Sequence, residues 1–314
     1  YLVSVIFPSA VIQWTITLLS MTIIAVAFGS VKPFVKVLGT VFLAVGLVIL
    51  AVFDAPWYQY ALGFGGMLNI LSLFALIPLI ALPIEIGRYG VSIQAMIQSR
   101  IKHSGMLYGI TSFLSYLLSS FMNLATLPMV YHTMRPALEV YPIEHKDRFI
   151  SRAITHGYSM PILWTPVAPI VGIVIEMTGV RWSSILPIVI PFSLLGLALD
   201  WTMGIWLSNR RQRTVDPAIA QELSAARESA VAPAARTGGR HPMQIAAAIV
   251  AFNGIVSVLE SVTHLSFLLL VTVLVIPFAL LWSCLLGQGR QFVKRSKEML
   301  PEHLLKMKEQ FYIF

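Results

Sequence analysis

Charged residues are scarce in this chain of 314 residues. Asp, Glu, Lys and Arg together make up 11% of it, 57% is apolar, and the mean hydropathy is +0.79. That balance excludes a water-soluble globular domain, in which about a quarter of the residues are charged. Several apolar runs approach or exceed the roughly 20 residues that a helix needs to cross the hydrocarbon core of a bilayer. The composition therefore predicts an all-α polytopic membrane protein.

Cysteine is almost absent, and so are the common sequence signatures of enzymes. The single cysteine, Cys284, lies in an apolar run and cannot form an internal disulfide. The chain contains no His-Glu-x-x-His pair, no pair of cysteines and no glycine loop that cradles phosphate. We therefore expect no catalytic residue, no metal site and no organic cofactor.

Basic residues are the charged residues in excess, with a formal net charge of +8. They gather in loops between apolar runs, at 85–104, 135–152, 209–241 and 288–308. Cytoplasmic loops of membrane proteins carry such an excess. We therefore predict a multi-pass protein of the cell (inner) membrane with these loops in the cytoplasm, and the lipid bilayer as its partner instead of nucleic acid.

The apolar runs divide the chain into about eight transmembrane segments, counting a re-entrant hairpin and an interrupted helix. The expected spans are 10–28, 34–53, 60–84, 149–180, 182–207, 243–259 and 265–286, with the hairpin at 105–135. We group them as N-terminal scaffold helices (1–84), a first transport repeat (85–208), a hydrophilic linker (209–241), scaffold helices of a second repeat (242–287), and a basic amphipathic helix with the start of a further segment (288–314).

A polar break lies in the middle of the apolar stretch 108–138. Ser119, Ser120, Asn123, Thr126 and a proline fall within ten residues there. Non-helical backbone at membrane depth is tolerated only where it is buried in protein or lines a wet cavity. We therefore predict a re-entrant hairpin with arms of about 12–15 residues, each too short to span the bilayer. The four residues are candidates for binding a solute or an ion; the alternative is polar packing between helices.

A second break is expected in the segment 149–180. Three prolines and a glycine lie within thirteen residues, 157–169. Proline removes helix hydrogen bonds, so we predict two half-helices around an unwound stretch. Ser159, Thr165 and Pro166 become candidates for ion binding through backbone carbonyls. The alternative is a proline kink whose freed backbone groups are satisfied by neighbouring helices.

Ionisable residues inside apolar segments are functional candidates by default. Asp200 and His156 are candidates for proton coupling, since a carboxylate and an imidazole can both carry the proton. The alternatives are that Asp200 nears the interface beside Trp201 and that His156 is a packing residue. Glu260 lies near the end of its segment, and we expect it to reach water.

The stretch 118–128, Leu-Ser-Ser-Phe-Met-Asn-Leu-Ala-Thr-Leu-Pro, resembles the Ser-Asn-Thr hairpin tip of the ion transporter superfamily. The divalent anion/sodium symporters of dicarboxylates and citrate are the best-known members of that superfamily. The stretch 165–169 resembles the unwound helix that follows the hairpin, and the resemblance covers roughly residues 60–200. Met122 and Leu124 depart from it, because the family carries Ser and Thr beside the central Asn.

The resemblance implies an inverted-repeat fold, elevator-type secondary transport of a small anionic solute, Na⁺ or H⁺ as the coupling ion, and a homodimer. The family's second hairpin would follow residue 314, so the chain looks like a partial copy. The expected function is therefore secondary active transport of a di- or tricarboxylate-like metabolite. The alternatives are a membrane-embedded enzyme or assembly subunit with structural kinks, and a channel.

Overall fold

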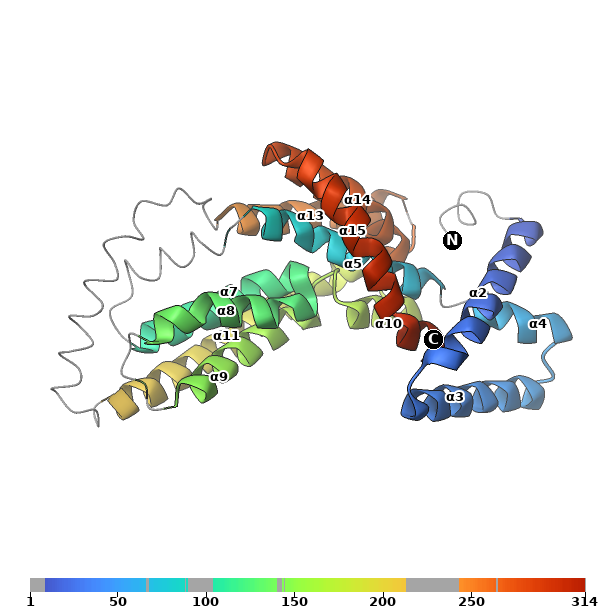
Figure 1. Ribbon diagram of the computed structural model, residues 1–314, viewed down its shortest axis with the longest axis horizontal. Helices are drawn as coiled ribbons and strands as arrows, with labels where there is room; N and C mark the ends of the chain where they lie inside the picture. Colours follow the sequence, from blue (N-terminus) through green and yellow to red (C-terminus); the bar gives the residue numbers. More distant parts are fainter. Residues whose placement is uncertain are drawn as a thin grey trace.

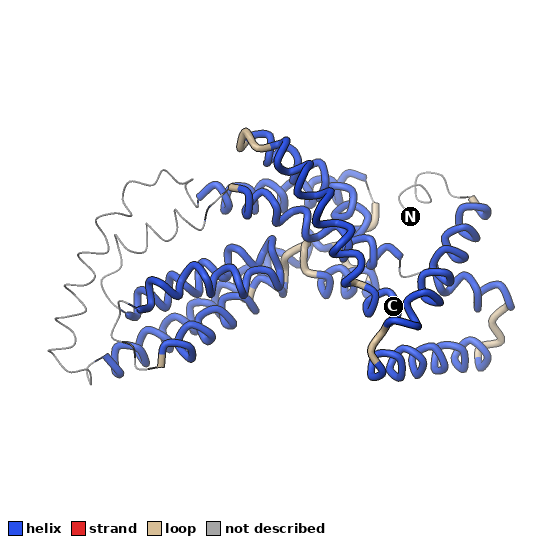
Figure 2. Tube along the Cα trace, in the orientation of Figure 1, coloured by secondary structure: helices blue, strands red, loops and turns tan. Residues whose placement is uncertain are grey.

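The computed structural model describes residues 9–65, 68–87, 89, 104–139, 143, 145–212, 243–263 and 265–313. Every regular element among them is a helix (Figure 2). The α-helices are α2 (Ala10–Ser30), α3 (Pro33–Val52), α4 (Trp57–Leu62), α5 (Leu68–Ile86), α7 (Ser104–Met122), α8 (Thr126–Glu139), α9 (Lys146–Ser159), α10 (Pro169–Thr178), α11 (Trp182–Gln212), α13 (Met243–Thr263), α14 (Phe267–Leu285), α15 (Gly289–Lys306) and α16 (Lys308–Ile313). Three 3₁₀ turns, η1 (Gly63–Gly65), η2 (Asn123–Ala125) and η3 (Pro161–Leu163), join some of them.

Seven helical stretches among the described residues are long and apolar enough to cross a membrane. They are Ala10–Ser30, Pro33–Val52, Trp57–Ile86, Gly105–Arg135, Trp182–Gly204, Met243–Thr263 and Phe267–Leu285. A helix is the natural form for such a run, because it satisfies all its backbone hydrogen bonds without water. The chain is thus an all-helical, multi-pass membrane protein, as its composition predicts.

The helices form three groups in space (Figure 1). Helices α7, α8, α9 and α11 lie together, and α5 packs against α14 and α15 beside them. Helices α2, α3 and α4 stand at the far end, where α16 contacts α2 and α3. Helix α5, which the sequence analysis groups with the N-terminal helices, therefore makes its main contacts with α14, far later in the chain.

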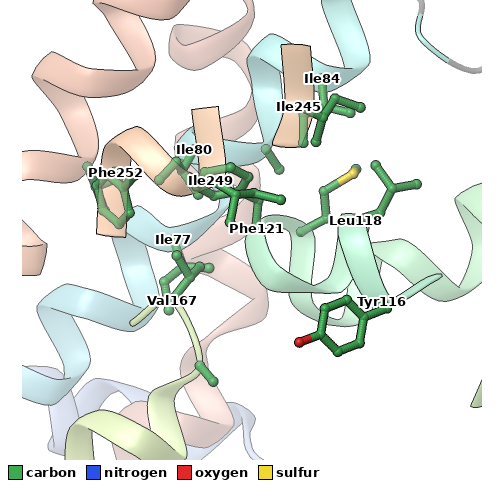
Figure 3. Packing of buried hydrophobic residues seen from close by; sticks show 14 of the residues in the cluster. Ile77, Ile80, Ile84, Tyr116, Leu118, Phe121, Val167, Ile245, Ile249 and Phe252 are labelled. Carbon is green, nitrogen blue, oxygen red and sulfur yellow. The ribbon is translucent and has the colours of Figure 1, made fainter. Parts of the chain in front are cut away.

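One apolar core joins α5, α7 and α13 (Figure 3). Phe121, near the end of α7, is fully buried there, with its ring centroid 5.9 Å from that of Phe252 and 5.7 Å from that of Trp282. Aromatic pairs at such separations add to the gain from burying their area. The core thus fixes the last turn of α7, just before the polar break.

Helices α7 and α9 run in the same direction. The rings of Tyr108 and Phe149, near the starts of the two helices, lie 5.5 Å apart between centroids. Toward their other ends, the hydroxyl of Thr165, which follows α9, donates a hydrogen bond to the carbonyl of Ser120 in the last turn of α7, 2.6 Å away. Gly157 permits the close approach between them, because a Cβ there would overlap the Ser112 carbonyl group.

Helices α8 and α9 run in opposite directions. Tyr158, at the end of α9, donates a hydrogen bond to Asn123, just before α8, at 2.9 Å. Tyr131, farther along α8, donates one to Asp147 at the start of α9, at 3.4 Å. Since α7 is parallel to α9, α8 runs back along α7. The chain reverses at η2, so the apolar stretch Gly105–Arg135 consists of two antiparallel helices and not one rod.

The first of these two helices is longer than predicted. Helix α7 has 19 residues, against the 12–15 predicted, whereas α8 has 14. Since α14 also has 19 residues, the prediction that each arm is too short to span the bilayer was wrong for α7. The hydroxyls of Ser115, Ser119 and Ser120 donate to carbonyls of the preceding turn at 2.7–3.1 Å. A hydroxyl that bonds back to its own helix does not end it. The break therefore starts only at Asn123.

The segment 149–180 is interrupted, in keeping with its prolines. Helix α9 ends at Ser159, and regular α-helix resumes only at Pro169, which occupies the first position of α10. Proline suits that position because it needs no intrahelical donor there. Gly179, with φ +64°, ends α10 in the left-handed conformation that glycine adopts readily.

The predicted amphipathic helix at 288–308 is α15, which packs across α5. Phe292 is buried, and His303 Nε2 lies 3.2 Å from the Phe74 carbonyl oxygen. On the exposed face a hydrogen bond from Lys306, at 2.7 Å, holds the pKa of the Glu302 carboxyl below its usual range. Most of the basic loop at 85–104 and of the linker at 209–241 lies outside the described residues.

Candidate functional site

The reversal between α7 and α8 depends on Asn123. Its φ of +47° lies in the left-handed region, which among non-glycine residues Asn adopts most easily. The Asn123 Oδ1 accepts the hydrogen bond from the Tyr158 hydroxyl, and the side chain is half-buried. This bond fixes the carboxamide and leaves its NH₂ group as the donor that Asn123 can offer to a solute.

Thr126, the first residue of α8, is completely buried, and its Oγ1 has no hydrogen-bond partner. Buried hydroxyls without a partner are uncommon in folded proteins and call for an explanation. The predicted candidates Ser119 and Ser120 differ from it, because their hydroxyls bond to carbonyls of their own helix. Of the three buried hydroxyls predicted at this break, only the Thr126 group lacks a hydrogen-bond partner among the described residues.

The second break meets the first through Thr165. Besides its bond to Ser120, the buried Thr165 side chain accepts a hydrogen bond from the Val167 N–H at 3.4 Å, and Pro166 beside it is also buried. Ser159, by contrast, is exposed, and its hydroxyl donates to the His156 carbonyl at 3.0 Å. The structure thus places Thr165 against α7, buries Pro166 and leaves Ser159 on the surface.

Side-chain hydrogen bonds hold the unwound stretch in place. The Trp164 indole N–H donates to the Tyr116 hydroxyl oxygen at 3.1 Å, and the Ser193 hydroxyl donates to the Met160 carbonyl at 3.0 Å. The Trp182 indole N–H donates to the Trp164 carbonyl at 2.8 Å. The bonds to the Met160 and Trp164 carbonyls supply partners for backbone groups that the proline-rich stretch leaves outside a helix.

Asp200 is the centre of a polar cluster between α7, α9 and α11. Its buried carboxylate accepts hydrogen bonds from the Tyr108 hydroxyl at 2.8 Å and the Ser112 hydroxyl at 3.2 Å. His156 Nδ1 lies 2.5 Å from the carboxylate, so the two predicted proton-coupling residues are in direct contact. Because an ionised carboxylate can only accept, Nδ1 carries the hydrogen in this contact.

His156 connects this cluster to the surface. Its side chain is 42% exposed, whereas that of Asp200 is 5% exposed. Gly204 allows α11 to pack closely against Tyr108, because a Cβ there would overlap the tyrosine ring. Asp200 is therefore an acid buried within the protein, and His156 has a specific polar partner.

Tyr108 and Ser112 were not among the residues predicted from the sequence. Their partner lies 92 and 88 positions later in the chain, so no local pattern pairs them with Asp200. A weak signal exists, because two hydroxyl residues four apart in an apolar helix lie on the same face. That spacing indicates a polar face without naming what it contacts.

The prediction that Glu260 reaches water was wrong. Its side chain is buried, and its two carboxylate oxygens accept hydrogen bonds from the backbone N–H groups of Trp182 and Ser183, both at 2.8 Å. Glu260, on α13, thus caps the beginning of α11. A negative charge at a helix N-terminus is favourable, since the first N–H groups have no partner within the helix.

No three His, Cys, Asp or Glu side chains of the described residues come together as a metal-ion site would need. A hard cation such as Na⁺ would have to use amide, hydroxyl and carbonyl oxygens, which both breaks contain. Comparison with known proteins found no matching family model, no similar curated protein and no similar solved structure.

Proposed function

We propose that this protein is a secondary active transporter of a small anionic metabolite, of the di- or tricarboxylate class. The supporting observation is the helix reversal at Asn123, packed against the interrupted α9–α10 segment, with the buried Thr126 hydroxyl unpaired beside it. Transporters bind their solutes with broken helices of this kind. A plain bundle of spanning helices gains nothing from such a break.

The chemistry of the hairpin tip, residues 123–126, favours an anion. The start of η2 and α8 turns the positive end of a helix dipole toward the tip. The Asn123 NH₂ group and the Thr126 hydroxyl add two donors. Residues 117–130 contain no Lys or Arg, so the solute meets dipoles instead of a fixed charge. Weak holding at several points suits a carrier, because the solute must also leave.

Each break also carries one exposed leucine. Leu124 is 67% exposed, and Leu163, in the second break, is 47% exposed. In the proposed arrangement α7 and α8 form a re-entrant hairpin that enters and leaves on the cytoplasmic side of the inner membrane. The elevator movement, the homodimer and the coupling to Na⁺ or H⁺ belong to the same proposal, in line with the resemblance to the ion transporter superfamily.

Two substitutions at the tip test this function in the full chain. Thr126→Val keeps the shape of the side chain and removes only a hydroxyl that has no partner, so the fold should be as stable as before or slightly more so. Asn123→Ala removes the carboxamide. Both variants should lose most uptake of radiolabelled succinate and citrate into proteoliposomes, measured beside thermal unfolding in detergent.

Thr272→Val is the matched control, because the hydroxyl of this buried threonine in α14 donates to the Leu268 carbonyl of its own helix, at 2.7 Å. It should transport at the rate of the unaltered protein. Normal uptake by a folded Thr126→Val variant would remove the tip from the mechanism. If the unaltered protein neither takes up the two acids nor is stabilised by them against heat, the proposed function is wrong. A conductance far above the turnover of a carrier would instead indicate a channel.

A further inference from the structure

We propose that Asp200 and His156 form the proton-binding site of the transporter, with H⁺ and not Na⁺ as the coupling ion. This inference rests on the proposed function and names the ion that the function leaves open. The first observation is that Asp200 is an acid buried in a membrane protein. A buried ionisable group in a membrane helix is expensive, and an apolar side chain would serve packing better.

The donors around the Asp200 carboxylate favour a proton over a metal cation. Both oxygens already accept hydrogen bonds, Oδ1 from Tyr108 and His156 and Oδ2 from Ser112. Na⁺ needs several oxygen ligands with free lone pairs, whereas an imidazole and two donating hydroxyls surround this carboxylate. A proton needs only one basic atom and a path to it.

In this proposal His156 is that path. The His156 side chain is 42% exposed and touches the carboxylate through Nδ1, which leaves Nε2 as the ring atom that can take a proton from outside. A proton from water binds at Nε2 and gives an imidazolium. The Nδ1–H bond then breaks as an O–H bond forms on Asp200 Oδ1, and the imidazole is neutral again, with its hydrogen on Nε2. The net change is one proton gained by the buried carboxyl.

Protonation changes the contacts that join α11 to α7 and α9. The ionised carboxylate attracts three donors, whereas the neutral carboxyl has lost its charge and holds them less strongly. Arg152 lies one turn before His156 in α9. Its guanidinium interacts with the Tyr108 hydroxyl and supplies a positive charge near the cluster. Proton uptake therefore makes the cluster more positive by one charge, which favours the simultaneous presence of an anionic solute.

No other described titratable group faces Asp200 from the elements that pack against α11. Helix α13 brings Glu260, but this residue caps Trp182, about 27 Å from Asp200 along the helix axis at roughly 1.5 Å per residue. The turn η3 contains no titratable side chain. On α7 the next such group is Tyr116, which bonds Ser193 two turns from Asp200.

The cluster lies close enough to the tip to influence it. Ser112 precedes Asn123 on α7 by about 16 Å along the axis. On α9, His156 is only two residues before Tyr158, whose hydroxyl holds the Asn123 carboxamide. A shift of α9 on protonation would therefore act directly on the solute-binding tip.

Transport by the full chain in liposomes tests the choice of ion. Radiolabelled succinate and citrate are offered under an inward proton gradient or an inward Na⁺ gradient, with a pH-sensitive dye inside. We expect the proton gradient to stimulate uptake and the lumen to acidify with it. Asp200→Asn and His156→Gln should abolish the stimulation, whereas Glu176→Gln, an exposed acid on α10, should keep it. Uptake driven by Na⁺ alone and unaltered in Asp200→Asn would overturn the inference and leave the proposed function standing.

Proton binding is also measured without any solute, so that failure of transport does not leave the site untested. On acidification of the purified protein, the infrared carbonyl band of a protonated carboxyl should appear and be absent from Asp200→Asn. In His156→Gln the band should appear more slowly after a pH jump, because the relay is lost. A spectrum identical in the unaltered protein and Asp200→Asn would refute the site. Tyr108→Phe, which removes a positioning hydroxyl, should shift the band without abolishing it.

Discussion

Replacing Glu260 with Ala should be among the most destabilising single substitutions in this protein. Its carboxylate is the partner of two backbone N–H groups at the start of α11, both at 2.8 Å, and the Trp182 side chain beside it is completely buried. Leaving a buried donor unpaired costs about 1–3 kcal/mol. Two such donors, partly satisfied by water that enters the space of the lost side chain, give a loss of about 2–5 kcal/mol in the free energy of unfolding.

The effect should be graded by the chemistry of the replacement. Glu260→Gln keeps one acceptor oxygen but turns an NH₂ group toward the second N–H, so about half of the loss is expected. Charge-assisted bonds are also stronger than neutral ones, which adds to the cost of the amide. The assay is unfolding of the purified protein in mixed micelles, followed by tryptophan fluorescence, because Trp182 lies at the site itself.

Glu176→Ala is the matched control. This glutamate is exposed on α10, and surface substitutions of this kind change stability by less than about 0.5 kcal/mol. If Glu260→Ala and Glu176→Ala unfold alike, the Glu260 carboxylate is not the partner of these N–H groups and the reasoning fails. A loss in Glu260→Gln equal to that in Glu260→Ala would show that charge, and not hydrogen-bond geometry, is what matters.

Three further substitutions test the packing of the hairpin. Gly157→Ala should lower the free energy of unfolding by about 1–3 kcal/mol, because the added methyl group meets the backbone of α7. The control is Gly254→Ala, at a position with open space, which should raise the free energy of unfolding by up to about 1 kcal/mol. Thr165→Val removes the buried bond between the two breaks and should cost about 1–3 kcal/mol, against little for Thr178→Val, whose hydroxyl bonds within its own exposed helix. Tyr158→Phe should cost about 0.5–1.5 kcal/mol and loosen the tip, visible as faster amide exchange there; unchanged exchange would contradict that role for its hydroxyl.

The spans of the helices could be predicted from the sequence because hydropathy and length act locally. The predicted span 10–28 corresponds to Ala10–Ser30, and 243–259 to Met243–Thr263. The interruption after Ser159 follows from its prolines in the same way. The length of α7 could not be predicted, because serine can either end a helix or bond back to it, and the choice depends on the neighbours.

The polar contacts between helices could not be predicted from the sequence. Because Glu260 lies near a segment end, the sequence predicts that it reaches water, yet the start of α11 covers it. Asp200 and His156 were each candidates, but their contact depends on how α9 and α11 cross. Such pairings are set by tertiary packing among residues far apart in the chain, for which periodicity carries no signal.

The partnership of α5 with α14 has a consequence for biosynthesis. Helix α5 ends at Ile86 and α14 begins at Phe267, so about 180 residues emerge between them, which takes on the order of 10–40 s at roughly 5–20 residues per second. During that interval the face of α5 that α14 will cover must be sheltered by lipid or by the insertion machinery. The nascent chain is therefore open to quality-control proteases at this face until α14 is made.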